Sequence, residues 1–133
     1  MLNTPEGMPE GRPNCAVVSI AAFAGVPYQT VEDHVRHQNA KDGRWKGRMH
    51  YSQVIAALNK LNKGRSAAFK IRQKMTLRQW INMHAQEDVL YMVLTTGHAQ
   101  TVLNGYVMDQ SGTWPINEYW GRRKYIKWAC AKK

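Results

Sequence analysis

The sequence predicts an α+β fold in which helices come first and an antiparallel β-sheet follows. Helix-capping residues flank apolar segments over the first two thirds of the chain, and strand-like apolar runs dominate from Asp88 onward. An Asn-Gly pair separates two of those runs, which is the strongest short-range signal of a β-hairpin. Hydrophobic residues make up 44% of the 133 residues, which excludes a disordered or collagen-like chain and favours a single domain over residues 1–133.

A buried central helix is expected to begin at Cys15, after a loop formed by residues 1–13. Asn14 suits its N-cap, and Gly25 suits the left-handed residue that ends a helix, with Pro27 shortly after it. The segment between these caps is apolar on all sides, so a helix here must be buried. A buried strand is the alternative, but the alanine content and the two caps favour the helix.

Two further helices are expected in the first half of the chain. The second spans about Tyr28 to His37, where Thr30 and Asp33 have the spacing of a capping box. A basic loop follows at residues 40–50. The third helix is predicted from Ser52, a candidate cap, through Asn62, because its apolar residues fall on one face.

The pattern then changes from helices to strands. Ala67 to Ile71 is predicted to form a short strand, and Thr76 with Gln79 makes a capping box that opens a fourth helix. Asp88 to Thr95 has the length and composition of a buried strand. Lys124 to Cys130 is a candidate last strand.

The hairpin joins a strand that begins at His98 to a strand that contains Asp109, through a two-residue turn at Asn104-Gly105. This turn pairs residue 103 with 106 and residue 100 with 109. Side chains alternate along a strand, so His98 and Asp109 fall on the same face, one diagonal step apart. A carboxylate at that position fixes the tautomer of an imidazole and stabilises its protonated form. The alternative is that both side chains are exposed and unrelated.

Cys15 is the candidate nucleophile, because the unpaired N–H groups at a helix start stabilise a thiolate and lower its pKa. The alternative is a small core cysteine. The second cysteine, Cys130, is expected to be a spare thiol, since two cysteines are too few for a disulfide scaffold. His34 and His37 lie three residues apart without a second pair at ligand spacing, so we expect a solvated helix surface there, no metal and no cofactor.

The segments Pro13–Ala22 and Thr96–Asp109 place a cysteine at a helix start, then Gly-His on a strand, then Asp on the next strand. This order resembles the papain-like cysteine peptidase superfamily, in particular its short forms such as bacteriocin-leader-processing peptidases and small phage-encoded relatives. The resemblance implies the papain-like fold. It also implies that Cys15 is the nucleophile, that His98 is the general base and later acid, and that Asp109 orients the imidazole.

The sequence departs from that family at the oxyanion hole. Papain-like enzymes often carry a glutamine about six residues before the cysteine, and Pro9 stands there in this chain. Asn14, Asn3 or backbone N–H groups would have to stabilise the oxyanion instead. The departure also leaves open a catalytically inactive protein that keeps the fold.

Charge is the strongest feature of the composition, with 19 Lys and Arg against nine Asp and Glu and a net charge of +10. Such a protein attracts polyanions, and basic residues interleaved with aromatic ones grip phosphates and stack on bases. The alternative is a solvated basic face without a specific partner. The candidate binding patch comprises Arg44, Trp45, Lys46, Arg48, Arg122, Arg123 and Lys124.

Two functions therefore remain open. The first is a small thiol hydrolase, a peptidase, isopeptidase or amidase, which acts on an acidic protein or peptide. The second is an inactive papain-like fold that binds nucleic acid or an acidic host protein. The chain lacks a signal-like start and an apolar run of the ~20 residues that a membrane span needs, so we expect a cytoplasmic protein with no membrane partner. The sequence does not predict the oligomeric state.

Overall fold

The computed structural model describes residues 2–11, 13–39 and 49–133. The fold is α+β, with one six-stranded antiparallel sheet whose strand order is β1-β6-β2-β3-β4-β5. The helices are α1 (Cys15–Ala24), α2 (Tyr28–Asn39), α3 (Tyr51–Leu61) and α4 (Leu77–His84), with a short 3₁₀ helix η1 at Ile116–Glu118. The strands are β1 (Ser66–Lys70), β2 (Tyr91–Thr95), β3 (His98–Leu103), β4 (Tyr106–Asp109), β5 (Gly112–Pro115) and β6 (Ile126–Lys132).

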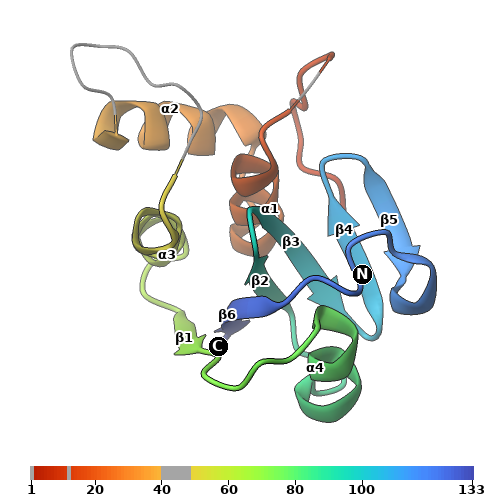
Figure 1. Cartoon of the computed structure of the whole chain (residues 1–133). Helices are drawn as coiled ribbons and strands as arrows, with labels where there is room; N and C mark the ends of the chain where they lie inside the picture. Colours follow the sequence, from red (N-terminus) through yellow and green to blue (C-terminus); the bar gives the residue numbers. More distant parts are fainter. Residues whose placement is uncertain (1, 12, 40–48) are drawn as a thin grey trace.

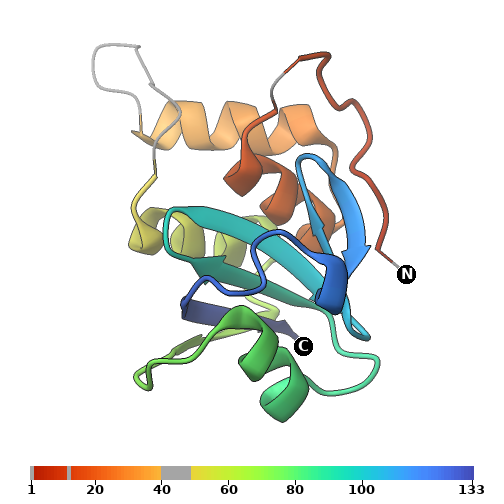
Figure 2. The ribbon, with the colours of Figure 1, turned by 45° about the vertical axis from the view of Figure 1, so that its right-hand side comes forward.

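Helices cover the two faces of the sheet unequally. α1, α2 and α3 lie together on one face, and α4 lies on the other (Figures 1 and 2). β2 is buried throughout its length, and its side chains alternate between the two layers. Met92 and Leu94 belong to the core under α1–α3, whereas Tyr91 and Val93 belong to the core under α4.

The central helix forms as the sequence predicts. Asn14 is its N-cap, and Gly25 ends it in the left-handed conformation with a φ of 72°. Seven of its residues are buried, including Val17, Ile20 and Phe23. Because the helix is apolar on every side, it packs between α2, α3 and the sheet rather than on the surface.

Two predicted helix caps are wrong, whereas the predicted start of the second helix at about Tyr28 is confirmed. Thr30 does not cap the second helix, because α2 already begins at Tyr28, and Asp33 instead accepts a hydrogen bond from Gln29 Nε2 at 2.7 Å. α3 begins at Tyr51 and not at Ser52, because His50 is its N-cap and the His50 N–H donates to Gln53 Oε1 at 2.8 Å. The capping box of Thr76 and Gln79 at the start of α4 is confirmed.

The strand boundaries differ from the predicted ones at several ends. β1 and β6 are displaced by one or two residues from the predicted segments. β2 is shorter than expected because Asp88 has a φ of 61° and its N–H donates to Asn104 Oδ1 at 2.6 Å, which holds it in a turn. The short strand β5 and η1 were not predicted, since Gly112–Pro115 contains both a glycine and a proline.

Candidate active site

Cys15 is the first residue of α1, and Asn14 fixes it there. The Oδ1 atom of Asn14 accepts hydrogen bonds from the N–H groups of Ala16 at 3.0 Å and Val17 at 3.2 Å. The N–H of Asn14 donates to the hydroxyl of Tyr28 at 3.0 Å, which ties the cap to α2. The thiol therefore lies at the positive end of a buried helix, as the sequence predicts.

His98 is the first residue of β3 and follows the tight turn Thr96-Gly97. Gly97 has a φ of 72°, a conformation that residues with a side chain rarely adopt. Nothing lies within 4 Å of the position that a Cβ at Gly97 would take, so a close neighbour does not explain the glycine. The glycine is needed for the turn that places His98 at the end of the strand.

The predicted register of the hairpin is confirmed. Leu103 pairs with Tyr106 and Thr101 with Met108, which sets Asp109 diagonally across from His98. The Nε2 atom of His98 lies 3.1 Å from Oδ2 of Asp109. Because Nε2 is taken by Asp109, the ring nitrogen left for Cys15 is Nδ1.

Asp109 is 3% exposed, and both of its carboxylate oxygens accept hydrogen bonds. Oδ1 accepts from the N–H of Ser111 at 2.8 Å. Oδ2 accepts from the hydroxyl of Tyr119 at 2.9 Å and from Nε1 of Trp120 at 3.0 Å, in addition to His98. Burial alone raises the pKa of Asp109, but the hydrogen bonds from His98, Ser111 and Tyr119 outweigh it and lower that pKa below its usual value of 3.8.

The ionisation of Cys15 and His98 is linked. Burial raises the pKa of Cys15, but the hydrogen bond with the His98 side chain, the bond from the Ala99 backbone and the imidazolium charge lower it below its ordinary value of 9.0. Burial lowers the pKa of His98, but its hydrogen bonds with Asp109 and Cys15 raise it from 6.5 to about 9. The lowered pKa of Cys15 and the raised pKa of His98 both favour a thiolate beside an imidazolium.

A cleft of about 410 Å³ opens beside this pair. Its walls come from the start of α1, the start of α3 and the turn before β3, and they include both Cys15 and His98. The other lining side chains are largely apolar and include Met49, Val54 and Leu94. A substrate carbonyl can reach the sulfur from this cleft, while the carboxylate stays buried behind the imidazole.

Three side chains of the site lie outside the residues that the sequence analysis selected. The Trp120 ring lies 4.9 Å from the His98 ring, measured between centroids, and its indole N–H holds Asp109. The Tyr119 hydroxyl lies between Asp109 and Gln100, whose Oε1 atom is 3.2 Å away. Burial and the Asp109 charge raise the pKa of Tyr119, so it stays a donor. Tyr119 and Trp120 follow η1 on a segment without a periodic pattern.

The proposed basic patch divides into two parts. Arg44, Trp45, Lys46 and Arg48 lie outside the described residues. Arg122 donates from Nη1 to the carbonyl of Tyr119 at 2.9 Å, and Lys124 Nζ lies 5.0 Å from the centre of the Trp120 ring. Arg123 is exposed. These three residues therefore place positive charge beside the segment that carries Tyr119 and Trp120.

The second cysteine and the two histidines of α2 lie away from the site formed by Cys15, His98 and Asp109. Cys130 is a buried core thiol, 0% exposed. His34 is half-buried rather than solvated, and among the described residues its Nε2 atom has no hydrogen-bond partner, whereas His37 is exposed. Within residues 2–11, 13–39 and 49–133, no group of three or more His, Cys, Asp or Glu side chains is placed to hold a metal ion.

No family model, no curated protein and no solved structure matches the chain in comparisons with known proteins. In the described part of the chain no helix is long and apolar enough to cross a membrane.

Proposed function

We propose that the protein is a small thiol hydrolase of the papain-like type. The observation that carries this proposal is the continuous link from Cys15 at a helix N-terminus, through His98, to the buried carboxylate of Asp109. The order of these residues along the chain and the antiparallel sheet that carries two of them support the papain-like assignment. The reaction class is cleavage of a peptide, isopeptide or other amide bond.

The chemistry follows from the protonation states. The Cys15 thiolate attacks the carbonyl carbon, and the carbonyl electrons move onto oxygen to form a tetrahedral oxyanion. The oxyanion collapses, the C–N bond breaks, and the His98 imidazolium donates its proton to the leaving amine. This leaves a thioester on Cys15. Neutral His98 then takes a proton from water, and the resulting hydroxide attacks the thioester carbonyl. The tetrahedral adduct collapses, the C–S bond breaks, and a carboxylic acid is released while the thiolate and imidazolium are restored. The acid gives its proton to solvent and becomes the carboxylate product.

Asp109 holds His98 throughout this cycle. Its carboxylate accepts from Nε2 and so keeps Nδ1 directed at the sulfur. The donors from Tyr119, Trp120 and Ser111 fix the carboxylate itself. A buried anion beside the ring also stabilises the imidazolium that forms the resting pair.

The oxyanion requires donors at the start of α1, since Pro9 stands where the family often has glutamine. The backbone N–H of Cys15 is one such donor, because the first N–H groups of a helix have no partner within the helix. We assign the second donor to the side-chain amide of Asn14, whose Oδ1 atom caps the helix next to the thiol.

The preferred substrate is an acidic protein or peptide. The net charge is +10, and Arg122, Arg123 and Lys124 follow Trp120 after a single glycine, on the segment that holds Asp109. An acidic chain is drawn to such a surface, and the attraction weakens with salt.

The alternative that the charge favours is a binding protein with the same fold and no turnover. Incubation of the protein with a mixture of acidic and basic peptides, followed by mass spectrometry of the products, separates the two functions. The hydrolase predicts new termini, preferentially in the acidic peptides, that are absent with Cys15→Ala. Salt-sensitive binding of nucleic acid or an acidic protein that persists in Cys15→Ala, without any cleavage, would overturn the hydrolase and support the binding protein.

A further inference from the structure

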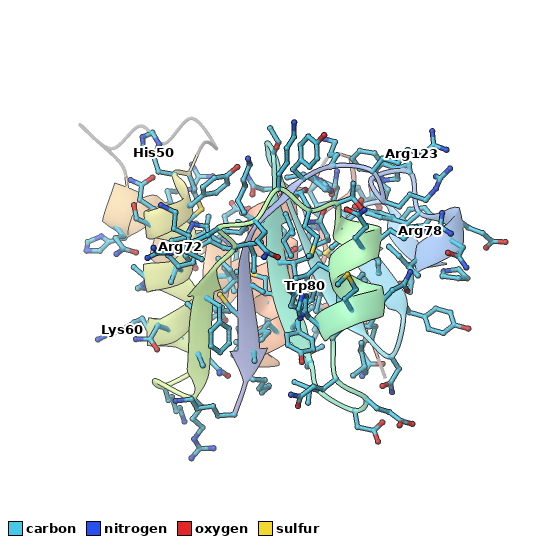
Figure 3. All side chains as sticks on the ribbon, turned by 60° about the horizontal axis from the view of Figure 1, so that its bottom comes forward. His50, Lys60, Arg72, Arg78, Trp80 and Arg123 are labelled. Atoms are coloured by element: carbon cyan, nitrogen blue, oxygen red, sulfur yellow. The ribbon has the colours of Figure 1, made fainter. Side chains whose placement is uncertain are left out.

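The face of the sheet that carries α4 has a groove of about 640 Å³ beside that helix. Apolar side chains from β6, β2, α4 and the segment after β1 form its floor, among them Ile71, Met75, Trp80, Tyr91 and Ala129. Figure 3 looks onto this face and shows Trp80 between α4 and the strands, with Arg72 just past the end of β1. α4 has only eight residues, so it leaves the part of the sheet formed by β1 and β6 uncovered.

One wall of the groove is the edge strand β1. β1 pairs only with β6. The hydrogen bonds at the two ends of the ladder fix its pattern, because Ile71 N–H donates to the Lys127 carbonyl and Lys133 N–H donates to the Arg65 carbonyl. Odd-numbered residues of β1 therefore face β6, and the backbone N–H and C=O groups of Ser66, Ala68 and Lys70 point away from it.

The outer edge of β1 is open to a partner. Ala68, Phe69 and Lys70 are all exposed, and the Phe69 ring is 54% exposed where it lines the groove. Among the described residues, no backbone group pairs with the outward N–H and C=O groups of Ala68 and Lys70. An edge with free backbone groups beside an exposed aromatic ring is the arrangement that an added strand completes.

The positive charge around the groove favours a negatively charged partner. Lys70 and Arg72 line it, both are exposed, and neither forms an ion pair or side-chain hydrogen bond with another described residue. Lys74, close by in the chain, lies over the Tyr125 ring at 4.8 Å. No Asp or Glu lies among the described lining residues. A cationic rim around an apolar floor is complementary to a segment that alternates carboxylates with apolar side chains.

We propose that the edge of β1 and the adjoining groove bind an extended acidic peptide segment as an added β-strand. The peptide backbone pairs with Ser66, Ala68 and Lys70. Its apolar side chains cover Phe69 and enter the groove, and its carboxylates meet Lys70 and Arg72. An acyl chain would fill the groove but would leave the strand edge unpaired, so the free backbone groups favour a peptide over a lipid. This surface does not depend on the proposed hydrolase, because none of its residues contacts Cys15 or His98.

The test uses the full chain labelled with ¹⁵N and a short fluorescent peptide in which Glu alternates with Ile and Phe. The proposal predicts that the amide signals of Ser66, Ala68 and Lys70 shift and gain protection from hydrogen exchange when the peptide is added, also in Cys15→Ala. The same peptide with N-methyl groups at its pairing positions, or with Lys in place of Glu, is expected to bind at least about tenfold more weakly. If either control peptide binds as tightly as the Glu-containing peptide, the proposal is overturned. It is also overturned if anionic phospholipid vesicles shift the amide signals of Ser66, Ala68 and Lys70 and the peptide does not.

Variants of the protein provide the matched controls. Ala68→Pro removes an outward N–H and leaves the β1–β6 ladder intact, so it is expected to weaken binding about tenfold. Phe69→Ser is expected to do the same, whereas Tyr106→Ser, at an aromatic residue 52% exposed on β4, is expected to leave binding unchanged. Lys70→Glu with Arg72→Glu is expected to abolish binding. Lys60→Glu with Arg78→Glu, at equal net charge and outside the groove lining, is expected to leave binding unchanged. If each control variant weakens peptide binding as much as the variant it is matched to, or if Ala68→Pro binds the peptide normally, the added strand is overturned.

Discussion

Cys130 is buried and Cys15 is half-buried, yet their pKa values shift in opposite directions. Burial raises the pKa of Cys130 to about 12 because no charged or hydrogen-bonding group offsets it. Burial acts in the same direction on Cys15, but the His98 side chain and the Ala99 backbone outweigh it and lower its pKa. Burial alone therefore makes a thiol inert, and the partners that the fold supplies make it reactive.

The position of each thiol in the fold explains its partners. Cys130 lies inside β6 and faces the core under α1–α3, where its cross-strand neighbours are Met92 and Ala68. Cys15 lies at a helix start, where three elements meet and a cleft reaches the sulfur. Of the two thiols, only Cys15 combines a helix N-terminus, a neighbouring strand end and access for a substrate.

The largest effect is expected from removing the reactive thiol. Cys15→Ala is expected to lower amide hydrolysis by roughly 10⁴-fold or more, because no other group in the cleft can form the thioester. Cys130→Ala is the matched control, expected to lose about 1 kcal/mol of folding stability and no activity. Initial rates of peptide cleavage for the two variants check this. A loss of activity in Cys130→Ala alone would reverse the assignment of the two thiols.

A smaller but still large effect is expected at the carboxylate. Asp109→Asn removes the negative charge behind His98, so the imidazolium becomes less stable and hydrolysis is expected to fall roughly 10²–10³-fold. Folding stability is expected to fall by about 1–3 kcal/mol, since four hydrogen bonds now meet a neutral amide. Glu118→Gln, at an exposed acid, is the control for both measurements. Equal rates for the two variants would remove Asp109 from the site.

The helix cap gives a third test, which separates reactivity from turnover. Asn14→Ser keeps an acceptor for the cap but removes the amide donor, so hydrolysis is expected to fall about 10²-fold while alkylation of Cys15 stays unchanged. Asn14→Ala is expected to lose about 1 kcal/mol of stability as well. Normal hydrolysis in Asn14→Ser would show that backbone N–H groups hold the oxyanion without Asn14.

The smallest expected effect is on the titration of the imidazole. The pKa of His98 is raised to about 9 partly by its hydrogen bond and charge contact with Cys15. Cys15→Ser removes the thiolate, so the pKa of His98 is expected to fall below about 9, and the ring loses its proton at a lower pH. NMR titration of the imidazole nitrogens measures this directly. An unchanged pKa would mean that Asp109 alone sets it.

Local patterns in the sequence predicted the parts of the site that are close in the chain. Asn14 as cap, Cys15 at the helix start and the hairpin register follow from capping preference and the Asn-Gly turn. The contact between Cys15 and His98 joins residues far apart in the chain, and only the family resemblance suggested it. Neither pattern nor resemblance indicated Tyr119 and Trp120, because they reach Asp109 from an irregular segment after η1.

Local signals were misleading at one helix cap and at one strand end. Thr30 has the spacing of a cap, yet the chain turns into α2 before it, after Pro27. The Asp88 backbone is held by Asn104 across a turn, which no pattern within its own segment reveals. Gly97 before His98 has a left-handed backbone, and no close neighbour would meet a Cβ there.

The most direct test of the contrast between the thiols is the pH dependence of alkylation at Cys15 and Cys130, resolved by mass spectrometry in the native protein. Cys15 is expected to react rapidly well below pH 9, while Cys130 stays inert until the protein unfolds. In His98→Ala the reactivity of Cys15 near neutral pH is expected to fall on the order of tenfold or more, because the thiolate loses its partner. A Cys15 that reacts no faster than Cys130, or equally fast without His98, would contradict the thiolate–imidazolium pair and the hydrolase built on it.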